Sequence, residues 1–161
     1  MVKKLDDFNV IVLGIIFDPK RKKILIGKRK KDLYLSKLSW AFPGGRLKYN
    51  EDIERALKER IKEKTSLKVE NLGSVFTKVY PEKKEFLSIY FLCEIVSGKE
   101  KAGKDFSELK WVKPEEVEKH FTTSFHPHLK EYILNLYGMV KLFLWAQRNQ
   151  LKRKINWEQI L

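Results

Sequence analysis

Apolar residues gather along the chain in five short runs, separated by polar or charged segments. The run at 10–17, VIVLGIIF, is almost continuously apolar, as is typical of a strand buried on both faces. Runs of this length bounded by turn-forming residues predict strands rather than helices. The predicted strands are 8–17, 22–28, 71–80, 86–96 and 106–112.

A different period appears after Gly44 and Gly45, where apolar residues recur at every fourth position. These residues are Ile53, Leu57 and Ile61. The spacing predicts a helix over 51–65, with Asn50 as its N-cap and Asp52 in its first turn. A short helix is predicted over 114–120 and a long one over 127–149.

The last predicted helix carries two sets of apolar residues. The larger set follows helical spacing and predicts a face that packs on the rest of the chain; it comprises Leu129, Tyr132, Ile133, Leu136, Tyr137, Val140 and Leu144. The second set, Leu134, Leu142 and Trp145, lies elsewhere around the helix, and Gly138 is expected to bend or split it. Burial within the chain is one interpretation of this second set. A homodimer or protein-partner surface over 127–149 is the other.

The segment 40–45, WAFPGG, leads into the first predicted helix and resembles the start of the Nudix box. That motif reads glycine, five residues, Glu, seven residues, Arg-Glu, an aliphatic residue, any residue, Glu-Glu, any residue, glycine, aliphatic residue. Its spacing is preserved over 45–67. The residues in register are Gly45, Glu51, Ile61, Glu63 and Leu67. The chain therefore resembles the Nudix (MutT-like) hydrolase superfamily over 8 to about 120.

Four positions depart from the family pattern, so this is a degenerate Nudix box. The Arg-Glu pair is reversed to Glu59-Arg60, the second residue of the Glu-Glu pair is Lys64, and the final glycine is Ser66. The resemblance implies an α/β fold, a Nudix-like α/β/α sandwich with a mixed sheet, here with an extra C-terminal helix. We expect a domain over 1–125 and a helix with a basic tail, 126–161, packed on it.

Nudix hydrolases cleave nucleoside diphosphate derivatives, and the resemblance implies that glutamates on the box helix bind magnesium or manganese. On the corresponding face, Glu63 is flanked by two cations, Arg60 and Lys64. Two unit charges about 4 Å apart interact by roughly 4 kcal/mol at an effective dielectric of about 20, so these cations oppose a divalent ion. They are suited to contact a phosphate directly, although drift after loss of the metal explains them equally well.

The leading hypothesis is accordingly a Nudix-fold protein with an impaired metal site that binds a nucleotide or RNA phosphate with little or no hydrolysis and without a cofactor. Its predicted phosphate contacts are Arg60, Lys64, Lys28, Arg29, Gly44 and Gly45. The alternative is an active hydrolase that uses magnesium or manganese, with Glu63 and Glu59 as catalytic residues and Glu63, Glu59 and Glu51 as metal ligands. A surface role for Glu59 and Glu63 also stays open, as does a third hypothesis, a subunit of a larger assembly.

Composition supports an anionic partner. The 161 residues carry a net charge of +13, more than solubility requires, although a lysine-rich surface is the alternative explanation. Basic residues in the tail lie near Trp145 and Trp157, a pattern found in RNA-binding segments and in frayed termini alike. The single cysteine, Cys93, allows no internal disulfide, and we find neither a signal-like segment nor a membrane-spanning run. We expect a cytoplasmic protein with no membrane partner.

Overall fold

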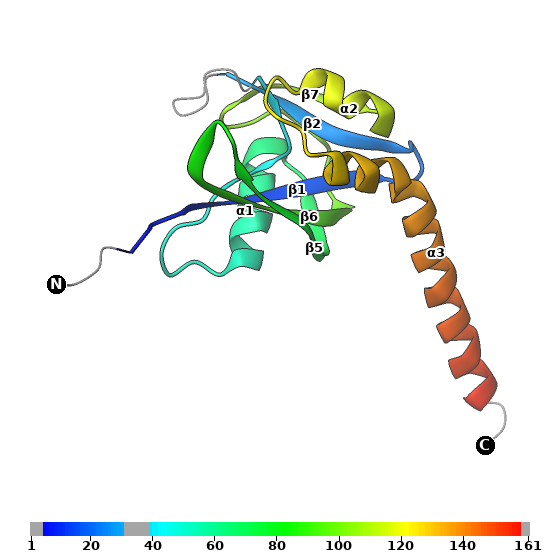
Figure 1. The fold of residues 1–161 in the computed structure, drawn as a ribbon. Helices are drawn as coiled ribbons and strands as arrows, with labels where there is room; N and C mark the ends of the chain where they lie inside the picture. The colour runs from blue at the N-terminus through cyan, green and yellow to red at the C-terminus, as the bar shows by residue number, and fades with distance from the viewer. Residues whose placement is uncertain (1–4, 31–38, 159–161) are drawn as a thin grey trace.

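The computed structural model describes residues 5–30 and 39–158. A mixed sheet with the strand order β3-β2-β1-β6-β5 forms its centre, with β4 paired to β1 and β7 paired to β2 (Figure 1). The strands are β1 Asn9–Asp18, β2 Lys23–Arg29, β3 Trp40–Ala41, β4 Gly44–Arg46, β5 Lys68–Tyr80, β6 Lys83–Ser97 and β7 Phe106–Val112. β1 and β6 run parallel and the other pairs are antiparallel. The expected α/β sandwich with a mixed sheet is confirmed.

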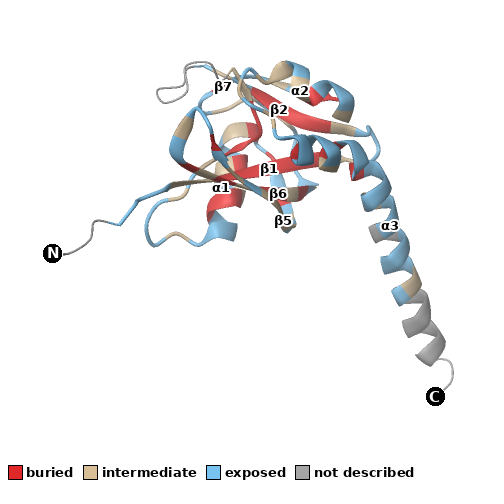
Figure 2. Cartoon of the chain, in the orientation of Figure 1, coloured by how far each residue is buried: buried red, intermediate tan, exposed pale blue. Residues whose placement is uncertain are grey.

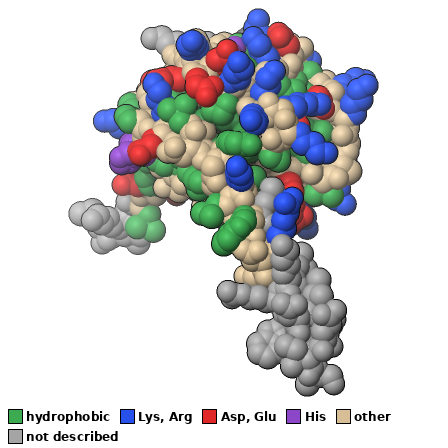
Figure 3. All heavy atoms as spheres, turned by 90° about the vertical axis from the view of Figure 1, so that its right-hand side faces the viewer, with side chains coloured by type: hydrophobic (Ala, Val, Ile, Leu, Met, Phe, Trp, Pro, Cys, Tyr) green, Lys and Arg blue, Asp and Glu red, His purple; other side chains and the backbone are tan. Residues whose placement is uncertain are grey.

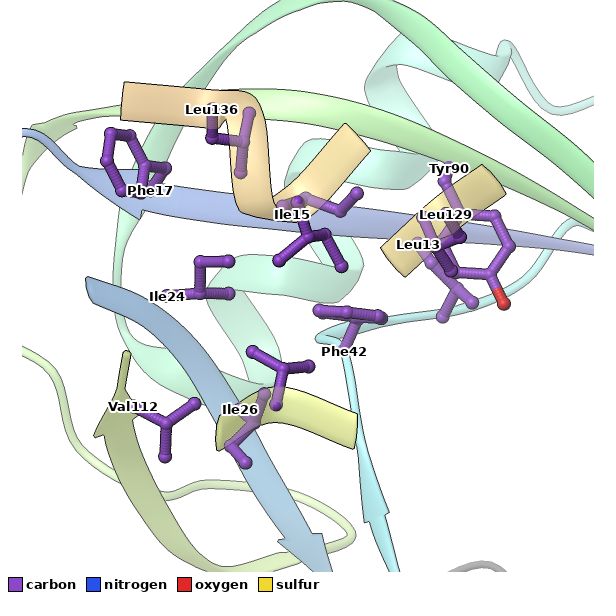
Figure 4. Close-up of a cluster of buried hydrophobic side chains, with 12 residues drawn as sticks. Leu13, Ile15, Phe17, Ile24, Ile26, Phe42, Tyr90, Val112, Leu129 and Leu136 are labelled. Atoms are coloured by element: carbon purple, nitrogen blue, oxygen red, sulfur yellow. The ribbon is translucent and has the colours of Figure 1, made fainter. Parts of the chain in front are cut away.

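Helices cover both faces of the sheet, which explains why β1 is apolar at nearly every position. Helix α1, Ile53–Thr65, packs Leu57 and Ile61 against alternate residues of β1, including Val12 and Ile16. The intervening residues of β1 face a second cluster, which helix α3 closes with Leu129, Ile133 and Leu136 (Figure 4). The helical segment predicted over 114–120 is a 3-10 turn, Pro114–Glu116, followed by α2, Val117–His120.

The N-terminus of α1 differs from the sequence prediction. Asp52 is the N-cap, and its carboxylate accepts a hydrogen bond of 2.9 Å from the backbone nitrogen of Arg55. Asn50 is instead a turn residue with a left-handed φ of 62°, a conformation that asparagine tolerates better than most residues. The prediction of Asn50 as the cap is therefore wrong, because Asp52 satisfies the free backbone nitrogens of the first turn.

Helix α3, Pro127–Glu158, leaves the body of the molecule after its first turns (Figure 1). Leu129, Ile133 and Leu136 are buried, whereas Leu142 and Trp145 are 64% and 61% exposed. Figure 2 shows the buried positions of α3 confined to its first turns. The distal part of the helix thus projects into solvent instead of lying on the domain. Within the described residues, none of the helices combines the length and the apolar character that crossing a membrane requires.

Candidate functional site

A cavity of about 240 Å³ opens where β4 joins β1, beside the last turn of α1. One part of its lining is charged: Arg29, Arg46 and Lys64 with one carboxylate, Asp105. The other part is largely aromatic: Phe42, Tyr80, Phe86, Tyr90, Phe106 and Phe121. The cavity can therefore hold a ligand that has an anionic end and a flat apolar end.

The two glycines of the WAFPGG segment bring β4 close to β1 at the cavity wall. Gly44 has a φ of +154°, and a Cβ atom there would collide with the carbonyl oxygen of Val12. A Cβ on Gly45 would lie 3.3 Å from the side chain of Arg60. Only glycine allows this close backbone approach at Gly44, which explains why the pair precedes the helix.

Lys64 lies in the last turn of α1 and lines the cavity. Its ammonium nitrogen is 5.5 Å from the centre of the Phe106 ring, within the range of a cation–π contact. Burial lowers the pKa of Lys64, and the neighbouring Arg29 guanidinium lowers it further, whereas Asp105 acts in the opposite direction. An anionic ligand would stabilise the protonated form of a lysine in such surroundings.

Arg60 does not line this cavity. One of its guanidinium nitrogens lies 2.8 Å from each carboxylate oxygen of Glu51, and the pair is mostly buried. The hydrogen bond from Arg60 lowers the pKa of Glu51, and a second one, from the backbone nitrogen of Lys48, lowers it further. Arg60 and Glu51 thus neutralise each other at the edge of the site.

The two other glutamates of the box lie on the exposed side of α1. Glu59 is 3.9 Å from Arg55 and 3.7 Å from Arg60, and Glu63 is 3.2 Å from Lys104. Neither lines the cavity. Across residues 5–30 and 39–158, no three His, Cys, Asp or Glu side chains come together in a way that could hold a metal ion. Magnesium in nucleotide sites is commonly held by one or two carboxylates together with substrate phosphates, so Glu63 and Glu59 remain the ligands predicted for it.

The structure divides the predicted phosphate contacts into two groups. Lys64, Arg29, Gly44 and Gly45 line the cavity together, whereas Arg60 is engaged with Glu51 and Lys28 is exposed on β2 outside the lining. Sequence reasoning missed several lining residues. These are Arg46, Asp105 and the aromatic wall. The alternation of Phe86 and Tyr90 on one face of β6 was the available signal for part of that wall.

A family model described as the NUDIX domain matches residues 7–134. The chain is 44% identical over 62 residues to a protein named 8-oxo-dGTP diphosphatase from Buchnera aphidicola, covering 38% of this chain and 45% of that protein. It is 37% identical over 102 residues to a protein named ADP-ribose pyrophosphatase from Methanocaldococcus jannaschii, covering 62% and 58%. The chain thus spans about half the length of these curated relatives.

Solved structures share the fold. A NUDIX hydrolase from Nitrosomonas europaea superposes with a TM-score of 0.67 at 20% identity, covering 82% of this chain and 73% of that one. A MutT protein from Methanosarcina mazei Go1 superposes with a TM-score of 0.63 at 16% identity, covering 86% and 99%. At these identities the similarity concerns the fold alone.

Proposed function

The chain belongs to the NUDIX domain family, and we propose that it binds a phosphate-bearing nucleotide in the cavity beside α1 with little or no hydrolysis. The observation that carries this proposal is the position of Lys64. Its register in the box is that of a family glutamate, and its side chain lines the cavity with Arg29 and Arg46. A cation therefore stands where the box pattern has a carboxylate.

The charged part of the cavity suits a phosphate group. Guanidinium groups offer paired donors for phosphate oxygens, and an ammonium adds a compact charge. Among the described lining residues, three cations, Arg29, Arg46 and Lys64, stand against one carboxylate, Asp105, so this part of the lining carries an excess of positive charge. A phosphate bound here offsets that excess and needs no metal to neutralise it.

The aromatic part of the cavity suits a nucleobase. Phe86 and Tyr90 come from β6 and Tyr80 from β5, and the hydroxyl oxygens of Tyr80 and Tyr90 are 3.4 Å apart. Burial raises the pKa of Tyr90, so its hydroxyl stays protonated and can donate a hydrogen bond. Flat faces combined with hydroxyl groups recognise a base by stacking and by its polar edge.

A mononucleotide fits this site better than an RNA strand. The cavity is compact, at about 240 Å³, and combines its charged and aromatic parts in one enclosure. On the face shown in Figure 3, Lys and Arg side chains are spread over the body with Asp and Glu among them, instead of forming one continuous track. An extended strand binds along such a track. The compact cavity makes RNA the second ligand to test.

The decisive experiment is calorimetric titration of the chain with 8-oxo-dGTP and ADP-ribose, the compounds named in its relatives, and with short RNA. Each titration is run with magnesium and with a chelator, and product formation is followed in parallel. We expect binding of a nucleotide that is insensitive to the chelator and weakens as salt rises, without turnover. Binding that requires magnesium, or steady product formation, contradicts the proposal.

The second candidate is a magnesium- or manganese-dependent hydrolase with a rearranged carboxylate site. The names of the two relatives favour it, and so does the exposure of Glu59 and Glu63, which are four residues apart on one helix. Glu63 is then the principal catalytic carboxylate, with Glu59 and Glu51 supporting it. Turnover by the wild-type chain that Glu63→Gln abolishes and Glu54→Gln preserves establishes this candidate.

A further inference from the structure

The exposed side of α3 carries an apolar strip that the domain does not cover. The strip consists of Leu134, Leu142 and Trp145, which are 43%, 64% and 61% exposed. The buried residues of the helix, such as Ile133 and Leu136, point the other way into the core. Residues 136–146 contain one charged residue, Lys141, so this stretch is apolar around most of its circumference. A helix of that composition is normally enclosed.

Gly138 lies at the centre of the strip, four residues from Leu134 and four from Leu142. Glycine is among the poorest helix formers, and, its own helix backbone and chain neighbours aside, none of the described residues lies within 4 Å of a Cβ atom added there. No contact with the described part of the chain therefore explains a glycine at this position. A small residue in the middle of an apolar strip allows the backbone of a second helix to approach closely.

The spacing of the strip makes it complementary to itself. If a second copy of α3 crosses the first antiparallel at Gly138, Leu134 of each copy lies opposite Leu142 of the other, because both are four residues from the crossing point. The same arrangement brings Glu131 of one copy within about one helical turn of Arg148 of the other. Both side chains are exposed in the chain. A parallel pair would instead bring Lys141 next to Lys141 of the other copy, and Arg148 next to Arg148, so that like charges would repel.

We propose that α3 is the interface of an antiparallel homodimer with a twofold axis at Gly138. Each domain lies on the far side of its own helix, because Leu129, Ile133 and Leu136 attach it opposite to the strip. The core therefore lies on the side of the helix opposite to Leu134 and Leu142. A lipid surface is the less suitable occupant, since a large apolar residue at position 138 would bind lipid better than glycine.

Sedimentation velocity of the full chain between about 1 and 100 µM tests this proposal. We expect a dimer in the upper part of this range. Leu142→Glu should raise the dissociation constant of the dimer more than tenfold, because it buries a charge in the interface. Gln147→Glu is the matched control, since it adds the same negative charge on the other side of the helix. Circular dichroism checks that both variants fold. Gly138→Leu should also dissociate the dimer, because its side chain has room in the monomer but keeps the two helices apart.

A charge exchange identifies the second copy as the occupant. Glu131→Arg is expected to weaken the dimer, and adding Arg148→Glu is expected to restore it, because each copy supplies both residues. A wild-type monomer at every concentration overturns the proposal. So does a monomer that co-floats with phosphatidylserine vesicles and loses that binding in Leu142→Glu, which assigns the strip to a membrane. Nucleotide titrations are independent of these results and test the cavity alone.

Discussion

Arg60, in the second half of α1, forms an ion pair with Glu51, which precedes the helix, and one guanidinium nitrogen lies 2.8 Å from both carboxylate oxygens. The two residues are only 11% and 21% exposed, and Arg60 also donates to the carbonyl oxygen of Arg46 at 3.4 Å. The pair therefore ties α1 to the loop that follows β4. The ion pair engages Arg60, which the sequence predicts as a phosphate contact. It also engages Glu51, which the sequence predicts as a metal ligand.

Loss of this pair should destabilise the domain. We expect Arg60→Met to lower Tm by roughly 2–4 °C, because Glu51 then keeps a charge without its partner. Arg55→Met is the matched control, since Arg55 is 66% exposed and its ion pair with Glu59 is 3.9 Å long. It should leave Tm nearly unchanged. Equal losses in the two variants would show that the Arg60 pair contributes nothing specific.

The same pair predicts how stability depends on pH. The hydrogen bond from Arg60 lowers the pKa of Glu51 in the folded chain. The resulting stability is fully present above the unfolded glutamate pKa of about 4.3, and it is lost as the pH falls through the lowered folded value. Urea unfolding between about pH 3 and 6 measures this loss. Glu51→Gln should flatten the curve in that window, and an unchanged curve contradicts the assignment.

Ser66 ends α1 with a left-handed φ of 62°, at the position where the Nudix pattern has glycine. Any residue with a Cβ is strained there, by about 1 kcal/mol or more. We expect Ser66→Gly to stabilise the chain by about 0.5–1 kcal/mol, since relief of the strain exceeds the added entropy of the unfolded state. Ser107→Gly, within β7, is the control and should destabilise the chain. Denaturant unfolding of both variants decides the matter.

The sequence predicts the long elements well because their signals are local. The apolar run of β1 and the four-residue spacing of Ile53, Leu57 and Ile61 each need no information from distant residues. The short strands β3 and β4 are missed, because WA and GGR carry no periodicity and become strands only by pairing with β2 and β1. Local pattern cannot reveal an element of two or three residues.

The candidate site is predicted in part for the same reason. Position in the box predicts Lys64, Gly44 and Gly45 as phosphate contacts, and in the structure all three line the cavity, while contact with a phosphate stays a prediction. The role of Arg60 depends on whether the loop brings Glu51 to it, and the structure shows that it does. The aromatic wall combines residues from five segments of the chain, so no single stretch of sequence reveals it.

The first turns of α3 should be indispensable to the domain. Ile133 is 1% exposed and closes a core cluster, so Ile133→Ala is expected to cost about 2–5 kcal/mol of unfolding free energy. Its neighbour Leu134 is 43% exposed, and Leu134→Ala should cost less than 1 kcal/mol when measured at a protein concentration where the copies are separated. If both substitutions cost the same, the helix does not complete the core and the domain divides at residue 125.

Lys64 is expected to supply most of the phosphate affinity from α1. Lys64→Met should weaken nucleotide binding by roughly 10- to 100-fold, the loss of one charged hydrogen bond of about 1.5–3 kcal/mol. Lys62→Met removes the same charge from an exposed position two residues away and should change affinity less than twofold. Calorimetry on both variants makes the comparison. Equal effects would mean that general positive charge, and not the cavity, attracts the ligand.

The pH dependence of binding gives a second test of Lys64. Burial lowers its pKa, with Arg29 adding to the effect, so the free chain loses this charge at a lower pH than an exposed lysine does. Affinity for a phosphate should therefore fall as the pH rises between about 7 and 10, while the ligand itself keeps its charge.

A bound phosphate favours the protonated amine of Lys64, so binding in this range should be accompanied by proton uptake, visible as a dependence of the calorimetric heat on the buffer. Arginine stays charged throughout, and Lys64→Arg should abolish both the fall and the uptake. If the fall persists in that variant, another group controls binding and Lys64 does not contact the phosphate.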